Sequence, residues 1–263
     1  MARWIGGLDG CRGAWAGALL DLDDPARFRT GLFARVSDLL DAPEAPVRVG
    51  IDIPIGLPER TEGGRAADRA ARAYLGPRGR ASVFPVPPRA AIEAADYASA
   101  KTLARRDSDP PRAPSIQLWN IVPAIREVDA LLRARPDLRP RLHEIHPEIA
   151  FRRLNGGAPL AAKKGLARRD GLEARRGLLV SAGLPEPLVR AGRARGVGAD
   201  DHLDALAGLV VARDILEGRA TPLPDPYGHD AHGLPVVIWM PAAPNSACGP
   251  VKGNSREGGG ESC

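Results

Sequence analysis

Two aspartates each close a short apolar run in the first fifth of the chain. Asp9 follows the run at 4–8, Trp-Ile-Gly-Gly-Leu, and Asp52 follows the run at 47–51, Val-Arg-Val-Gly-Ile. A third acidic group, Asp200, Asp201 and Asp204, begins an amphipathic segment near the other end of the chain. Hard cations such as Mg²⁺ or Mn²⁺ bind through a few carboxylates together with substrate phosphate oxygens. The pattern predicts a divalent-metal site with Asp9, Asp52, Asp201 and Asp204 as ligands.

The spacing of the later acids leaves one choice open. Asp201 and Asp204 are three residues apart and share a helix face, but Asp200 and Asp204, four apart, share one as well. Acids in the first turn of a helix also favour its dipole, and aspartates at strand ends often stabilise turns. Taken singly, each acid has such a structural explanation. The occurrence of all of them at the ends of predicted elements favours a common site.

A histidine and several basic residues could complete this chemistry. His146 and Glu148 follow a short alternating segment, where His146 could act as a general acid or base, or be a half-buried hydrogen-bonded residue. Arg69 and Arg72 lie one helical turn apart and could clamp a phosphate, whereas a solvated charged face is the alternative. The predicted phosphate contacts are Arg12, Arg69, Arg72, Lys163 and Lys164.

The elements that must position these residues can be read from the apolar periodicity. We expect a hairpin from 4–9 and 15–21, a third strand at 27–33, a helix at 36–40 and a fourth strand at 47–53. A helical insertion at about 54–115 follows, with helices at 65–75 and 89–105. A helix at 117–134, a fifth strand at 141–146, a basic helical stretch at 160–182, a helix at 199–216 and a strand at 234–239 complete the order.

This order of elements is that of the ribonuclease H fold. We therefore predict an α/β fold with a ribonuclease H-like mixed five-stranded sheet flanked by helices. In that fold the first and fourth strands are neighbours, so Asp9 and Asp52 would lie side by side. The last helix would bring its first-turn acids onto them.

Length and composition are those of one globular domain. The 263 residues, 44% of them hydrophobic, can bury one sizeable core, which we place at 1–241, with a disordered tail at 242–263. No apolar run reaches the roughly 20 residues of a membrane span, and no secretion signal is evident, so we expect a cytoplasmic protein with no membrane partner. The three cysteines have no zinc or disulfide spacing. A net charge of +5 suits a polyanionic partner such as nucleic acid, although an arginine-rich solvated surface explains it equally well.

Seven segments, in order across nearly the whole chain, resemble domain-of-unknown-function family 429, whose members are described as predicted nucleases of the ribonuclease H fold. These segments are residues 6–15, 51–58, 68–72, 82–85, 127–129, 146–148 and 199–205. The resemblance implies an active-site set of Asp9, Asp52, Glu148, Asp201 and Asp204. One departure is Ala124, where the family pattern favours lysine.

Together these observations predict a metal-dependent nuclease or phosphodiesterase, with nucleic acid or a nucleotide as substrate. Two divalent ions about 3.5–4 Å apart would activate water and stabilise the leaving oxygen, with Asp9 bridging them. Two other classes remain open. One is a non-catalytic module that binds nucleic acid or another anion on the same fold. The other is an actin-like phosphotransferase, which needs two such domains where the sequence shows one set of strands.

Overall fold

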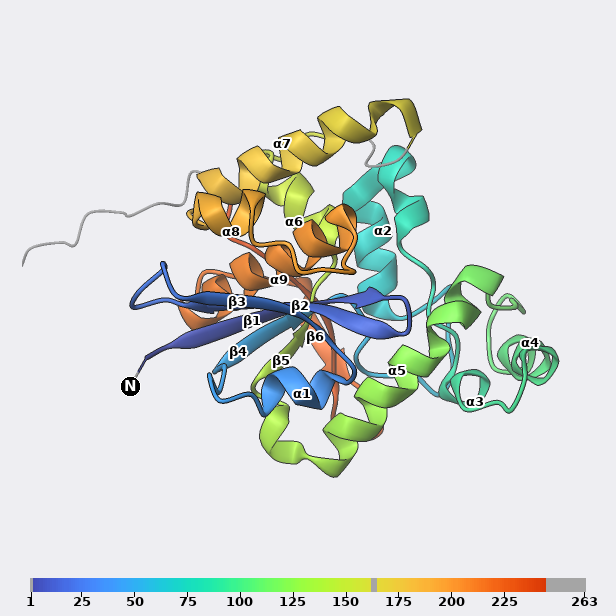
Figure 1. Cartoon of the computed structure of the whole chain (residues 1–263). Coiled ribbons are helices and arrows are strands. Elements are labelled where there is room, and N and C mark those ends of the chain that lie inside the picture. Colours follow the sequence, from blue (N-terminus) through green and yellow to red (C-terminus); the bar gives the residue numbers. More distant parts are fainter. Residues whose placement is uncertain (1, 162–164, 245–263) are drawn as a thin grey trace, which may run out of the picture.

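A five-stranded mixed sheet forms the centre of the molecule. The computed structural model describes residues 2–161 and 165–244. The strands are β1 (Trp4–Cys11), β2 (Ala14–Asp21), β3 (Phe28–Phe33), β4 (Arg48–Ile51) and β5 (Leu142–Glu144), in the sheet order β3-β2-β1-β4-β5 (Figure 1). Strands β1, β2 and β3 are antiparallel neighbours, whereas β4 and β5 run parallel to β1. The predicted mixed five-stranded sheet flanked by helices is therefore confirmed, including the adjacency of the first and fourth strands.

Two helices cover one face of this sheet. Helix α1 (Val36–Leu40) matches its predicted bounds, and α5 (Ile116–Ala134) presents a buried stripe to the strands. Trp4 and Leu8 of β1 pack in the same apolar cluster as Val122 and Ile125 of α5. Burial of this apolar surface holds α5 on the sheet and so places the residues of its first turns next to the strand ends.

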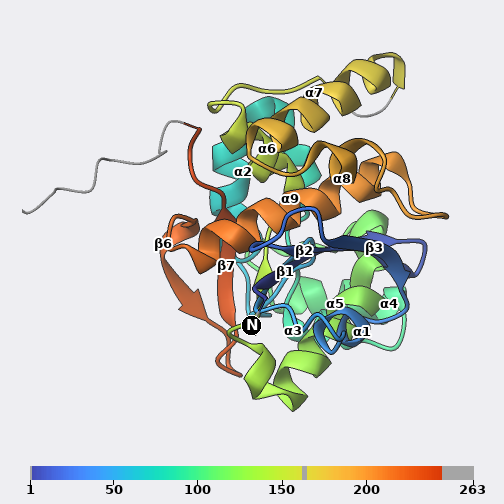
Figure 2. The ribbon, with the colours of Figure 1, turned by 60° about the vertical axis from the view of Figure 1, so that its left-hand side comes forward.

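Helix α9 (Ala199–Leu216) crosses the opposite face, also at its predicted bounds. Its outer side is covered by α6 (Pro147–Leu154), α7 (Arg168–Ser181) and α8 (Glu186–Arg190), as Figure 2 shows, which explains why it is apolar on nearly every side. Gly7, Gly50 and Gly208 let α9 approach the sheet closely. A Cβ on Gly7 would lie 2.0 Å from the Ala205 carbonyl oxygen, and one on Gly50 would lie 2.6 Å from that of Gly208.

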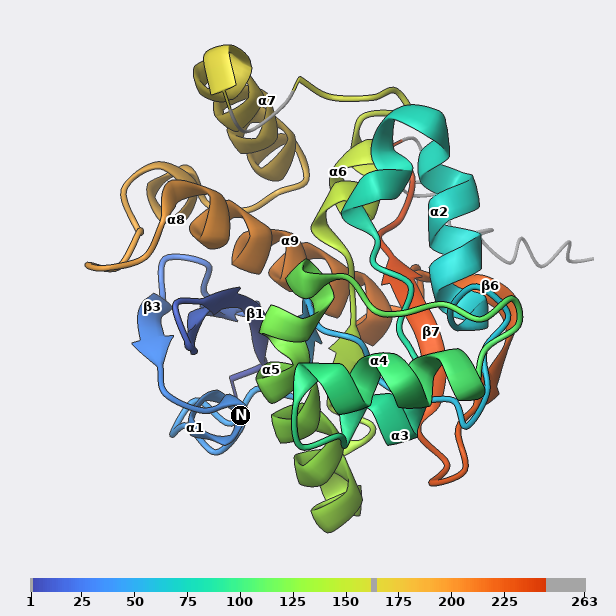
Figure 3. The same cartoon turned by 90° about the vertical axis from the view of Figure 1, so that its right-hand side faces the viewer.

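The segment after β4 carries three helices and a short 3-10 turn. These are α2 (Ala66–Gly79), η1 (Arg80–Ser82), α3 (Arg89–Ile92) and α4 (Tyr97–Arg106). Figure 3 shows α3 packed on both α4 and α5, and α2 near α6. The prediction of one helix at 89–105 is wrong, because the Asp96 carboxylate accepts the Ser99 backbone N–H at 2.8 Å and starts a new helix there.

A second sheet of two strands was only half predicted. β7 (Pro235–Met240) corresponds to the strand expected at 234–239, but its antiparallel partner β6 (Thr221–His229) was not expected. Three prolines, Pro222, Pro224 and Pro226, obscure β6, since proline cannot donate to a strand ladder and argues against a strand. Two further 3-10 turns are η2 (Pro136–Leu138) and η3 (Gly165–Ala167). Of the tail predicted at 242–263, residues 245–263 lie outside the described residues. No helix in the described ranges is long and apolar enough to cross a membrane.

Candidate active site

The parallel register of β1 and β4 makes Asp9 and Asp52 neighbours. Leu8 pairs with Ile51, and the Asp52 backbone N–H donates to the Leu8 carbonyl at 3.0 Å, so the next position on each strand is an aspartate. Gly7 and Gly50 face α9, and alternation along a strand turns Asp9 and Asp52 to the same face. The sheet thus brings together the two strand-end carboxylates that the sequence predicted.

Both aspartates line a cavity of about 220 Å³, which we call the acidic cavity. Asp9 is 7% exposed and Asp52 is partly buried. The charged and polar side chains around the cavity are those of Asp9, Asp52, Asp68, Glu144, Arg65, His146 and Ser82. Four carboxylates therefore face one guanidinium among the described lining residues, an excess that attracts cations. Ala124 of α5 also lines this cavity.

A buried ionic network supports the cavity from the side of α2. Arg65 donates to Asp68 Oδ1 from Nε and Nη2, at 3.0 and 2.7 Å, and to Glu144 from Nη1 and Nη2, at 2.8 and 2.7 Å. Glu144 also accepts the Ile55 backbone N–H at 2.7 Å. Burial alone would lower the pKa of Arg65, but the charges of Asp68 and Glu144 raise it overall, so the guanidinium stays charged. Burial raises the pKa of Glu144, and Arg65 offsets only part of that effect.

His146 lies between β5 and α6 as the residue preceding the helix. Its ring is half-buried, and Nε2 donates to the Ser82 carbonyl at 3.3 Å, which assigns the proton to that nitrogen. This contact matches the half-buried hydrogen-bonded residue considered above, and the position in the cavity wall matches an acid or base. The structure therefore places His146 with Asp9 and Asp52.

The acids of α9 lie near the same end of β1. The thiol of Cys11, two residues beyond Asp9, has a pKa raised by burial and by the neighbouring Asp201 carboxylate. Ala205 contacts Gly7, and Gly208 contacts Gly50, further along the helix. Asp204 lies between Asp201, which is beside Cys11, and Ala205, and it is 6% exposed.

None of the described residues that line the acidic cavity comes from α9. Asp200 and Asp201 are both partly exposed.

The donor set can be compared with what a divalent ion requires. Within residues 2–161 and 165–244, no three His, Cys, Asp or Glu side chains lie close enough together to form a metal-binding group. Mg²⁺, however, is commonly held by one or two carboxylates, with water and substrate phosphates completing its shell. Asp9 and Asp52, two hard oxygen donors facing one cavity, fit that mode of binding.

Other predicted residues lie elsewhere. Glu148 accepts from Nη2 of the buried Arg175, at 3.0 and 2.8 Å, and lines a neighbouring cavity. Arg69 donates to the carbonyls of Glu62 and Gly64, and Arg72 to those of Arg80 and Val83, so both hold backbone segments. Arg12 is exposed in the hairpin turn after β1. Lys163 and Lys164 lie outside the described residues.

One family model matches the part of the chain that contains the candidate site. The model of a family described as "Protein of unknown function (DUF429)" matches residues 7–228. The chain belongs to family DUF429. The matched range contains Asp9, Asp52, His146, Glu148 and the acids of α9. No curated protein and no solved structure matches the chain.

The sequence did not identify three residues of this candidate site, which are Arg65, Asp68 and Glu144. Asp68 belongs to one of the segments that resemble the family, and its position three residues after Arg65 is that of a capping residue. Glu144 had a visible signal, because a glutamate within a short strand is rarely buried without a partner. No signal in the sequence indicated that this partner is Arg65, which lies 79 residues before Glu144.

Proposed function

We propose that this DUF429 chain is a divalent-metal-dependent phosphodiesterase or nuclease that hydrolyses a phosphodiester bond in a nucleic acid or nucleotide. The observation that carries the proposal is the placement of Asp9 and Asp52 on adjacent parallel strands, facing one cavity. Paired carboxylates at strand ends are suited to hold Mg²⁺ or Mn²⁺. The bound ion would supply Lewis-acid stabilisation of the phosphate and lower the pKa of a water molecule.

The topology supports a ribonuclease H-like assignment for the fold. In the strand order β3-β2-β1-β4-β5, the first strand lies beside the fourth, which is the adjacency expected of that fold from the sequence. The long helix α9 also follows β5 and lies over β1 and β4, as the assignment requires. We propose this fold relationship on the topology alone.

The chain's own residues have separate roles in this proposal. Asp9 and Asp52 would hold the cation. Asp204 and Asp201 add negative charge at the α9 end of the site, and Glu144 is kept in place by Arg65. His146, in the wall of the acidic cavity with Asp9 and Asp52, would serve as a general acid or base.

The test is hydrolysis of labelled single-stranded and duplex DNA, RNA and cyclic or linear dinucleotides with Mg²⁺ or Mn²⁺. Wild type is compared with Asp9→Asn, Asp52→Asn and the matched control Asp137→Asn, an exposed aspartate that lines neither cavity. We expect metal-dependent cleavage that falls by roughly two orders of magnitude in the first two variants and is unchanged in the control.

Folding of each variant is checked by circular dichroism. Cleavage that survives in both Asp9→Asn and Asp52→Asn would contradict the proposed site. Absence of cleavage by folded wild type, together with metal-independent binding of the same nucleic acids, would instead favour the non-catalytic binding module.

A further inference from the structure

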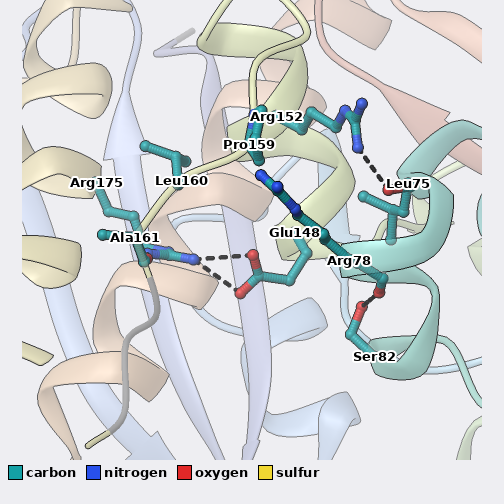
Figure 4. Close-up of a pocket in the computed structure, with 10 residues that line it drawn as sticks. Leu75, Arg78, Ser82, Glu148, Arg152, Pro159, Leu160, Ala161 and Arg175 are labelled. Carbon is teal, nitrogen blue, oxygen red and sulfur yellow. Dashed lines mark hydrogen bonds and ion pairs between the residues drawn. The ribbon is translucent and has the colours of Figure 1, made fainter. Parts of the chain in front are cut away.

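A second and larger cavity adjoins the acidic cavity. It has a volume of about 600 Å³, and we call it the basic pocket. Ser82 lines both cavities, so they meet at this residue, whose carbonyl accepts from His146. The basic pocket is lined by Leu75, Arg78, Gly79, Ser82, Glu148, Arg152, Pro159, Leu160, Ala161 and Arg175 (Figure 4).

Arg78 is an uncommitted cation in this pocket. Helix α2 is interrupted at Gly76, which has a φ of 63° and is followed by Pro77, and the residues after the break line the pocket. Figure 4 shows the Arg78 side chain extending from α2 across the cavity. Within the part of the chain that the structure describes, its guanidinium has no hydrogen-bond or ion-pair partner.

The other two arginines differ in how their donors are used. Arg175 is 1% exposed and donates to Glu148 and to the carbonyls of Ala161 and Gly171, so its charge is balanced within the protein. Arg152 donates to the carbonyls of Gly157 and Leu75, groups that carry no net charge. The pocket therefore has the charge of Arg78 and Arg152 available for an anion.

Among the described residues, the apolar part of the wall consists of Leu75, Pro159, Leu160 and Ala161. In Figure 4, Leu160 and Ala161 lie across from Ser82. A ligand that matches both the two arginines and the apolar wall carries an anionic group joined to a flat or apolar group. A nucleotide has this combination, since its phosphate is anionic and its base can pack on apolar side chains.

We propose that the basic pocket binds a nucleotidyl unit next to the phosphodiester at the acidic cavity, with its phosphate at Arg78 and Arg152 and its base against Leu160 and Pro159. This inference rests on the proposed function and adds the recognised part of the substrate to it. The shared residue Ser82 allows one continuous strand or dinucleotide to occupy both cavities.

The experiment measures binding of adenosine 5′-monophosphate by titration calorimetry with EDTA present, so that no metal contributes. Wild type is compared with Arg78→Gln and Leu160→Ser. The matched control is Arg105→Gln on α4, an exposed arginine that lines neither cavity. We expect Arg78→Gln to weaken binding about tenfold. We expect Leu160→Ser to weaken binding of the nucleotide but not of inorganic phosphate, and Arg105→Gln to bind both as wild type does.

The inference is overturned if wild type does not bind the nucleotide, or if Arg78→Gln binds it as wild type does. If inorganic phosphate binds as tightly as the nucleotide, the proposed contact of the base with Leu160 and Pro159 is wrong. Failure here is distinguishable from failure of the proposed function. Cleavage without nucleotide binding rejects only the basic pocket, whereas nucleotide binding without cleavage rejects only the hydrolysis.

Discussion

Arg65 and Glu144 form a two-pronged buried ion pair. Nη1 donates to Oε2 at 2.8 Å and Nη2 to Oε1 at 2.7 Å, with the two side chains 1% and 4% exposed. The pair joins the start of α2 to the end of β5 at the wall of the acidic cavity. Removing one partner of such a pair leaves the other charge buried and uncompensated.

We therefore expect Arg65→Met to lower the free energy of unfolding by about 3–5 kcal/mol. Urea unfolding followed by circular dichroism measures this change. The control is Arg190→Met, which removes ion pairs to Glu173 and Glu186 on the surface and should leave the unfolding midpoint nearly unchanged. Equal midpoints for Arg65→Met and wild type would show that the network contributes no stability.

The contact of α9 with the sheet depends on Gly208. A Cβ there would lie 2.8 Å from the Gly50 carbonyl oxygen and 3.0 Å from the Gly7 Cα, and both are backbone atoms that cannot rotate away. We expect Gly208→Ala to lower the free energy of unfolding by about 3 kcal/mol. Gly177→Ala in α7, where a Cβ meets nothing within 4 Å, should instead raise it by roughly 0.5–1 kcal/mol. Thermal unfolding of the two variants measures both changes. A Gly208→Ala variant as stable as wild type would contradict the close packing of α9 on the sheet.

The free energy of unfolding should decrease at low pH because of His143 on β5. Burial, with a further effect of the charge on Arg48, lowers the pKa of His143 to about 4 in the folded chain, against about 6.5 when unfolded. The neutral ring therefore contributes its full stability above pH 6.5, and this is lost as the pH falls from 6.5 toward 4, because the unfolded state takes up the proton first. The loss amounts to less than about 3 kcal/mol, since the ring is partly exposed.

Urea unfolding of wild type and His143→Gln at several pH values between 7.5 and 5 checks this expectation. The difference in unfolding free energy between the two proteins should shrink or reverse as the pH falls. His202, whose pKa is also lowered by burial, contributes to both proteins and cancels in the difference. Parallel curves over the whole range would exclude His143 as the source.

The ambiguity between Asp200 and Asp201 can be resolved through the contact of Asp201 with Cys11. That contact places Asp201 toward the end of β1 that carries Asp9. On the proposed function we expect Asp204→Asn and Asp201→Asn to reduce metal-dependent hydrolysis by about 10–100-fold, and Asp200→Asn by less than about threefold. Initial rates at several Mg²⁺ concentrations measure the effect. A larger loss in Asp200→Asn than in Asp201→Asn would reverse the assignment.

The sequence alone determined the elements with strong local patterns. The apolar segments before Asp9 and Asp52, the helix at 36–40 and the helix at 199–216 were predicted close to their observed bounds, because periodicity and turn residues act over a few neighbouring positions. The adjacency of Asp9 and Asp52 was also predicted, since both strands end in an acid and the order of elements makes the strands neighbours.

Only the tertiary structure decided which distant side chains meet. It paired Arg65 with Glu144 and Arg175 with Glu148, it added the proline-rich β6 to β7, and it separated Glu148 from the acidic cavity although His146, two residues earlier, lines it. Such contacts depend on the angle and depth at which helices pack on the sheet. Those are set by steric fit across the whole core, as at Gly7, Gly50 and Gly208, and leave no periodic signal in the residues that they bring together.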